Sequence, residues 1–271
     1  MTVAGAPPKV TTATLRQKKA QRERITALTA YDHLFASLLD EAGVDVLLVG
    51  DSVATVVQGR DTTVPVTMDQ MVYHTEMVAR AAKRALVVGD LPFLSYQIGV
   101  EDALRNAGRL LKEGLAEAVK LEGGIDFAPT VQRLVAAGIP VMGHLGLTPQ
   151  SIHQFGSYRA RGIDEAEQQR ILDDAKALEQ AGAFALVLEK VPAELARRVT
   201  ASVSVPTIGI GAGPHTDGQI LVTHDLLGLF TRFRPRFVRR YKQLGAEIGD
   251  AVRAYCRDVQ GGAFPSADES Y

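Results

Sequence analysis

Short apolar runs alternate with longer segments of helical spacing along most of this chain. Residues 45–51, Asp-Val-Leu-Leu-Val-Gly-Asp, form an apolar run of the kind found in a parallel strand that is covered on both faces. The segment 67–84 instead has the apolar spacing of a helix, with Thr67 placed as an N-cap. Because the two patterns keep alternating with no linker between them, they predict an α/β protein built on a parallel sheet.

The alternation predicts eight strands with helices between them. Strands are expected at 24–30, 45–51, 85–92, 116–124, 140–148, 184–189 and 206–213, with an eighth, less regular strand within 219–228. Helices are expected at 32–41, 67–84, 100–113, 129–138, 164–182 and 193–201. This count in a chain of 271 residues favours a closed (β/α)8 TIM barrel over the alternative, a doubly wound open sheet.

We expect one barrel domain across 1–271. Within it, residues 1–23 are predicted to be a tail and capping helix, and residues 235–271 a C-terminal helical segment and tail. The basic segment 15–24 could be a targeting arm or a nucleic-acid contact, but a solvated helix is the interpretation we favour.

The predicted strand at 116–124 carries two charges where a barrel core should be apolar. Successive side chains of a strand point to opposite faces, so Lys120 and Glu122 share one face while Val119 and Leu121 share the other. Burying a charge without a partner is prohibitive. This strand must therefore end in an ion pair, a ligand site or both.

Polar residues also end several of the other apolar strands. The C-terminal ends of all strands in a barrel open on one face, where active sites are found. Side chains that are far apart in the sequence should therefore gather at one mouth; they are Asp51, Ser52, Asp90, Lys120, Glu122, His144 and Glu189. The competing interpretation is that each carboxylate only caps the next helix or bonds a loop amide.

Three of these carboxylates, Asp51, Asp90 and Glu122, would form an anionic, all-oxygen ligand set. Hard divalent cations prefer such ligands, and Mg²⁺ is often held by few carboxylates together with waters and substrate oxygens. The open positions suit a chelating 2-oxo acid. Lys120 would then offset the carboxylate of the substrate or a developing enolate oxygen, or it would only pair with Glu122.

Composition and charge narrow the classes of partner. The net charge of -1 gives no reason to expect nucleic acid. Cys256 is the only cysteine, which fits a reducing cytosol and is expected to be a buried or half-buried thiol. No apolar run is long enough to span a membrane, so we expect a cytoplasmic protein with no membrane partner.

Nine segments together closely resemble ketopantoate hydroxymethyltransferase. The likeness extends from about Ile25 to about Tyr255, and its motifs are long and ordered, which makes it far more specific than a single glycine motif. The segments are 48–52, 64–67, 73–74, 90–93, 119–124, 143–150, 188–189, 208–213 and 216–219. The resemblance implies a barrel of the phosphoenolpyruvate/pyruvate superfamily type. It also implies transfer of a hydroxymethyl group from 5,10-methylenetetrahydrofolate to 3-methyl-2-oxobutanoate, giving 2-dehydropantoate for pantothenate and coenzyme A synthesis.

The resemblance also implies roles for individual residues. It makes Asp51, Asp90 and Glu122 the site of one Mg²⁺ per subunit, directly or through water, and Glu189 the catalytic acid or base. The oxo acid would be bound by residues that match the family's substrate site: Asp51, Ser52, Asp90, Lys120 and His144. The reaction would pass through a metal-stabilised enolate, with Glu189 acting either on the proton at C3 or on the folate nitrogen.

The resemblance implies a homo-oligomer as well, with a decamer as the expected form. Two other functions remain open at this point. One is another Mg²⁺-dependent carbon–carbon lyase or mutase acting on a different 2-oxo acid. The other is a non-catalytic metabolite-binding protein, which the full set of ionisable residues disfavours.

Overall fold

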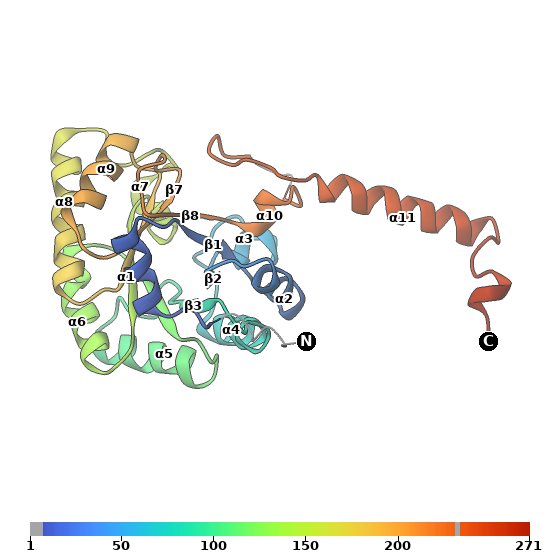
Figure 1. Ribbon diagram of the computed structural model, residues 1–271, viewed down its shortest axis with the longest axis horizontal. Coiled ribbons are helices and arrows are strands. Elements are labelled where there is room, and N and C mark those ends of the chain that lie inside the picture. Colours follow the sequence, from blue (N-terminus) through green and yellow to red (C-terminus); the bar gives the residue numbers. More distant parts are fainter. Residues whose placement is uncertain (1–7, 231–233) are drawn as a thin grey trace. The chain divides into compact units, whose positions relative to one another are not determined.

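The computed structural model describes residues 8–230 and 234–271, which belong to two compact units divided between Leu221 and Val222. In the first unit, eight parallel strands close into a barrel in chain order (Figure 1). They are β1 (Ile25–Thr29), β2 (Val46–Val49), β3 (Leu86–Asp90), β4 (Ala118–Glu122), β5 (Val141–Gly146), β6 (Ala185–Glu189), β7 (Thr207–Ile210) and β8 (Gly218–Leu221). The expected TIM barrel is therefore confirmed.

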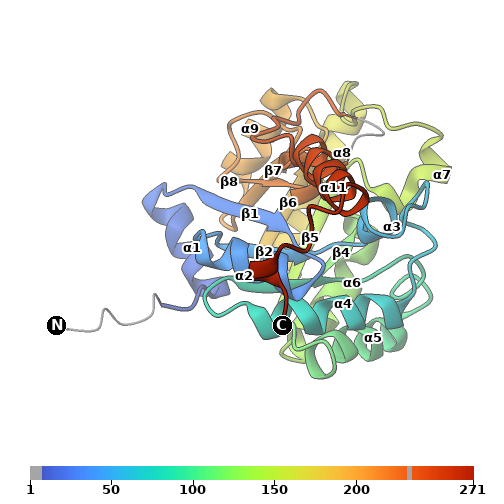
Figure 2. The ribbon, with the colours of Figure 1, turned by 90° about the vertical axis from the view of Figure 1, so that its right-hand side faces the viewer.

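Within the first unit, helices follow the strands and surround the barrel, as Figures 1 and 2 show. Six helices match predicted ones: α2 (His33–Glu41), α4 (Met68–Ala81), α5 (Val100–Lys112), α6 (Ala128–Ala136), α8 (Glu165–Gln180) and α9 (Ala193–Ser202). Thr67 is the N-cap of α4, as predicted, and forms a capping box with Gln70. The short elements were not predicted: α3 (Val53–Val56), η1 (Ile125–Phe127), η2 (Pro149–Ser151) and α7 (Ile152–Phe155).

Strand alternation divides the apolar residues into two layers. Val119 and Leu121 belong to the layer between the sheet and the helices. Ala118 belongs to the second layer, inside the barrel, together with residues such as Val88 and Met142. Since side chains alternate along β4, Lys120 and Glu122 continue the inner row toward the C-terminal end of the barrel.

Helix α1 (Thr12–Gln21) is mostly exposed or partly exposed, as its charge predicts, but three of its side chains fix it to the barrel. Leu15 is fully buried. Lys18 forms an ion pair with Asp45 at 2.8 Å, and Lys19 forms one with Asp217 at 3.0 Å. The basic side chains of this segment thus fix α1 against residues next to β2 and β8, and they neutralise carboxylates rather than face an external partner.

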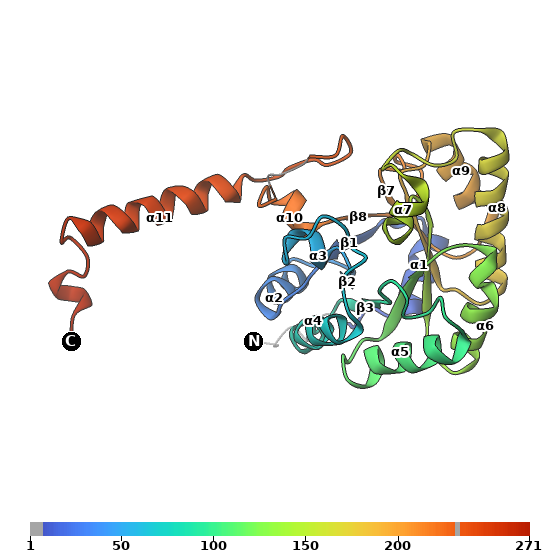
Figure 3. The same cartoon turned by 180° about the vertical axis from the view of Figure 1, so that it is seen from behind.

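The second unit contains α10 (Thr223–Leu226), α11 (Leu244–Gln260) and η3 (Ala267–Glu269), the last two shown clearly in Figure 3. None of the residues of α11 is buried. Cys256 lies on this helix and is exposed, so the prediction of a buried or half-buried thiol is wrong. The expectation of one domain across 1–271 stays a prediction. Among the described residues, no helix is long and apolar enough to cross a membrane.

Candidate active site

The inner row of side chains ends in charged groups that face one another across neighbouring strands. Asp90 is the register partner of Lys120, and Glu122 is the partner of His144. Lys120 Nζ lies 2.9 Å from Asp90 Oδ1 and 3.7 Å from Glu122 Oε1. The prediction that Lys120 and Glu122 share a face and compensate each other is therefore confirmed.

Burial and mutual charge control how these groups ionise. Burial acts to lower the pKa of Lys120, but Asp90, Glu122 and Asp51 outweigh it and raise the pKa above its usual value. The side chain is 3% exposed and remains an ammonium. Burial would raise the pKa of Glu122, yet Lys120 and His144 lower it, so Glu122 is ionised.

Asp51 is the carboxylate of the site whose negative charge is least balanced by nearby cations. Burial raises its pKa well above the usual range, and the negative charges of Asp90 and Glu122 raise it further. Its backbone N–H donates to Asp90 Oδ2 at 3.2 Å, which joins the ends of β2 and β3. Burial also raises the pKa of Asp90, although Lys120 acts in the opposite direction. The site therefore holds more buried negative charge than its own cations neutralise.

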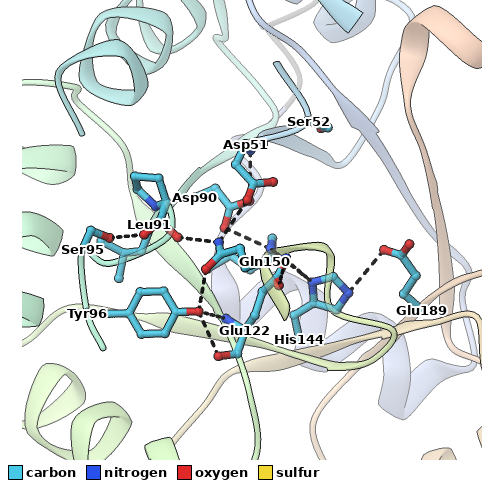
Figure 4. Close-up of polar contacts among 12 residues, drawn as sticks. Asp51, Ser52, Asp90, Leu91, Ser95, Tyr96, Glu122, His144, Gln150 and Glu189 are labelled. Carbon is cyan, nitrogen blue, oxygen red and sulfur yellow. Dashed lines mark hydrogen bonds and ion pairs between the residues drawn. The ribbon is translucent and has the colours of Figure 1, made fainter. Parts of the chain in front are cut away.

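His144 lies between two carboxylates, as Figure 4 shows. Its Nδ1 is 3.3 Å from Glu122 Oε1 and its Nε2 is 3.4 Å from Glu189 Oε2. Burial and Lys120 act to lower the pKa of His144, but Glu122 and Glu189 raise it to about 9. Lys120 Nζ is also 3.2 Å from Nδ1. Because both ring nitrogens face carboxylates, we take His144 as an imidazolium whose Nδ1 proton points to Glu122.

Glu189 ends β6 and is the most accessible carboxylate of the site, with 16% of its side chain exposed. Ser52 lies beside Asp51 at the upper edge of the site in Figure 4, and its Oγ is 2.8 Å from Tyr31 Oη. His74 Nδ1 contacts the carbonyl oxygen of Tyr31 at 2.7 Å. Both residues of the Tyr73-His74 segment lie outside the charged cluster, and His74 acts on it only through Tyr31.

The structure thus brings all seven predicted side chains to the C-terminal end of the barrel. It adds two that were not predicted, Tyr96 and Gln150. Tyr96 Oη donates to the carbonyl oxygen of Glu122 or to Gln150 Oε1, at 3.0 and 2.9 Å. Gln150 belongs to a segment that the sequence singles out, 143–150, but an uncharged residue in a loop gives no sign of burial. Its position just after the fifth predicted strand was the one sequence feature that could have placed it at the mouth of the barrel.

The oxygen donors of this site suit a divalent cation, but their side chains do not form a complete coordination site for one. Across 8–230 and 234–271, no group of three or more His, Cys, Asp or Glu side chains is arranged to hold a metal ion. The ammonium of Lys120 instead lies among the carboxylates. The surplus negative charge that raises the pKa of Asp51 is nevertheless what a bound cation would relieve. Asp51, Asp90 and Glu122 supply the hard oxygen donors for it.

The family model described as ketopantoate hydroxymethyltransferase matches residues 9–267. A 3-methyl-2-oxobutanoate hydroxymethyltransferase from Prosthecochloris aestuarii is 58% identical over 268 residues, covering 97% of each chain. One from Salinibacter ruber is 59% identical over 264 residues, covering 97% of this chain and all of the relative.

Solved structures with the same fold are much more distant in sequence. A phosphonopyruvate hydrolase in complex with oxalate and Mg²⁺ has a TM-score of 0.61 at 15% identity, covering 95% of this chain and 92% of the other. A 2,3-dimethylmalate lyase, described as a member of the PEP mutase/isocitrate lyase superfamily, also has a TM-score of 0.61, at 19% identity and with 98% and 93% coverage. These likenesses show that the solved structures share the barrel fold of this chain.

Proposed function

Since the chain belongs to the ketopantoate hydroxymethyltransferase family, we infer that it transfers a hydroxymethyl group from 5,10-methylenetetrahydrofolate to 3-methyl-2-oxobutanoate and forms 2-dehydropantoate. The structural observation that best supports this function is the cluster of four buried charged residues at the end of the barrel: Asp51, Asp90, Lys120 and Glu122. Such a cluster suits a small, anionic substrate that becomes more negative at one oxygen during the reaction. The pathway is that of pantothenate and coenzyme A.

We propose that Asp51, Asp90 and Glu122 hold one Mg²⁺ per subunit, directly or through water. When bound, the cation would act as a Lewis acid toward the oxo oxygen of the substrate. Lys120 is the cation of the chain itself in this cluster, and we assign it to the substrate carboxylate or to the developing enolate oxygen. The hydroxyl of Ser52 supplies a further hydrogen-bond donor to the substrate. The imidazolium of His144, whose two ring nitrogens face Glu122 and Glu189, adds its positive charge to the binding of the anionic substrate.

Glu189 is the proposed catalytic acid or base. It is exposed enough to reach a substrate, while the contact of Oε2 with His144 Nε2 fixes the direction of its carboxylate. As a base it removes the proton from C3 of the oxo acid, and the resulting enolate attacks the one-carbon unit and forms the new carbon–carbon bond. Water then replaces the folate nitrogen on that carbon and supplies the oxygen of the hydroxymethyl group, since the donor carries a methylene group without oxygen. As an acid it donates a proton to the folate nitrogen that leaves. Exclusion of water from the buried part of the site protects the enolate in either case.

Replacement of Glu122 by glutamine should weaken metal binding without unfolding the barrel. The substitution keeps the size of the side chain but removes a charge that Lys120 and His144 stabilise. In D₂O, the wild-type protein with Mg²⁺ should exchange the C3 proton of 3-methyl-2-oxobutanoate, as followed by NMR. Glu122→Gln should require about tenfold or more Mg²⁺ for half-maximal exchange. Exchange with an unchanged Mg²⁺ requirement would remove Glu122 from the metal site.

We also propose that the protein is a homo-oligomer, with a decamer as the expected form. Helix α11 supports this proposal, since Ile248, Val252, Tyr255 and Val259 form an exposed stripe at helical spacing. An aspartate at Val252 should therefore lower the native mass measured by mass spectrometry. Arg257→Asp is the matched control, because Arg257 lies about 180° around the helix from the stripe. A wild-type monomer would contradict the proposal.

The cytoplasm is the compartment that we propose. The exposed thiol of Cys256 is compatible with a reducing environment.

A further inference from the structure

Gln150 lies at the centre of the site and connects the ends of four neighbouring strands (Figure 4). It follows β5, in η2, and is 4% exposed. Its Nε2 donates to Asp51 Oδ2, beyond β2, at 3.0 Å and to the carbonyl oxygen of Leu91, beyond β3, at 2.9 Å. Its backbone N–H donates to Glu122 Oε2, at the end of β4, at 3.0 Å.

The oxygen of the Gln150 amide also has hydrogen-bond partners. Oε1 accepts a hydrogen bond from Gln97 Nε2 at 3.1 Å and lies 2.9 Å from Tyr96 Oη, whose single proton goes to Oε1 or to the Glu122 carbonyl oxygen. The Leu91 carbonyl can only accept and the Gln97 amide nitrogen can only donate, so these two contacts fix which end of the amide is nitrogen. Both donors of the side chain and at least one acceptor position are therefore used, and the amide has one orientation.

This orientation determines how Asp51 presents its carboxylate. Among the described residues, the side-chain donor to that carboxylate is Gln150, which engages Oδ2 and leaves Oδ1 for another ligand. Asp51 also lies beside Asp90, whose Oδ2 accepts the backbone N–H of Asp51 at 3.2 Å. Without an N–H donor at Oδ2, it would be expected to rotate away from Asp90 and Glu122.

We propose that Gln150 is a positioning residue that holds Asp51 and Glu122 in the arrangement needed to bind the divalent cation. The inference rests on the proposed function, because it assumes that these carboxylates are the metal site. Gln150 touches neither the reacting atoms nor the cation. It acts by fixing the direction of Asp51 through its side chain and that of Glu122 through its backbone, and groups behind metal ligands often have such a role.

Direct Mn²⁺ binding tests the proposal without measuring turnover. Mn²⁺ prefers the same oxygen ligands as Mg²⁺, and its free concentration can be followed by electron paramagnetic resonance during a titration. Gln150→Met keeps approximately the length of the side chain but removes both donors. It should raise the dissociation constant of Mn²⁺ by about ten- to a hundredfold. Excess Mg²⁺ should restore most of the lost kcat, since affinity rather than chemistry has changed.

Gln169→Met is the matched control. Gln169 Nε2 donates to Asp173 Oδ1 at 2.9 Å on the exposed surface of α8, so the same kind of bond is removed away from the site. This variant should bind Mn²⁺ like the wild-type protein. If Gln150→Met does not fold, Gln150→Asn keeps a buried amide but withdraws it by about one carbon–carbon bond, and the same weakening is expected.

The possible results distinguish the proposed role of Gln150 from the proposed metal site itself. Wild-type affinity for Mn²⁺ in a folded Gln150→Met or Gln150→Asn variant would overturn the role of Gln150 alone. Absence of Mn²⁺ binding by the wild-type protein, with 3-methyl-2-oxobutanoate present, would overturn the proposed metal site and this inference together. Weak binding that excess Mg²⁺ does not rescue would show a general loss of structure and would also contradict positioning.

Discussion

Replacing Glu189 with glutamine is expected to lower kcat by about a hundred- to ten-thousandfold, the usual contribution of a general acid or base. Glutamine has the size of glutamate but cannot exchange a proton at this position. The barrel should stay intact, because Glu189 is partly exposed and its carboxylate contact is with His144. The measurement is the steady-state rate of 2-dehydropantoate formation at saturating substrates, together with exchange of the C3 proton.

The exchange experiment distinguishes the two roles of Glu189. Loss of exchange together with loss of transfer would identify Glu189 as the base at C3. Retained exchange with slow transfer would place it on the folate side. Glu194→Gln is the control, since Glu194 is an exposed glutamate paired with Arg197 on α9. A Glu189→Gln variant with the turnover of the wild-type protein would remove Glu189 from catalysis.

Replacing Lys120 with methionine is expected to cost the folded state about 3–5 kcal/mol at neutral pH, as is typical when one partner of a buried ion pair is lost. Methionine fills a similar volume but leaves Asp51, Asp90 and Glu122 without the ammonium that lies among them. Binding of the oxo acid should be lost as well. Chemical denaturation and the KM for 3-methyl-2-oxobutanoate measure the two effects.

The stability deficit of Lys120→Met should depend on pH in a defined direction. Without the ammonium, the pKa values of the buried carboxylates rise in the folded state, above those of the unfolded chain. The folded variant then binds more protons than the unfolded one, so its stability falls as the pH rises from about 4 to 7. Lys112→Met, at an exposed position of α5, should show no deficit. Equal unfolding free energies of Lys120→Met and wild type would contradict the assigned charge balance.

The fold was largely predictable because each strand and helix has its own pattern. The apolar run around Val46–Val49 and the capping residue Thr67 are local signals that the tertiary structure leaves unchanged. Strand alternation alone placed Lys120 and Glu122 on one face. The segment at 15–24 is mostly solvated, as its charge pattern predicts. The ion pairs of Lys18 and Lys19 with Asp45 and Asp217 were not predictable, because these carboxylates are distant in sequence.

The charged residues of the site could be predicted because they lie at strand ends, but the hydrogen bonds that join them could not. A polar residue after an apolar strand indicates the mouth of a barrel, and this located the carboxylates, Lys120 and His144. The bridging role of Gln150 depends on a turn after β5 that carries its amide to Asp51, 99 positions earlier in the chain. No local pattern encodes such a contact. The same holds for Tyr96, whose hydroxyl meets Glu122 only after the β3–α5 segment folds.

Formation of 2-dehydropantoate from 3-methyl-2-oxobutanoate and 5,10-methylenetetrahydrofolate, measured by mass spectrometry of the product, tests the central claim most directly. The account predicts rapid, divalent-cation-dependent formation by the wild-type protein, and loss of most of it in Glu189→Gln. Turnover of a different 2-oxo acid with none of this one would indicate a lyase or mutase of the same fold. Binding of the oxo acid without any turnover would indicate a non-catalytic protein, and either result would contradict the assigned function.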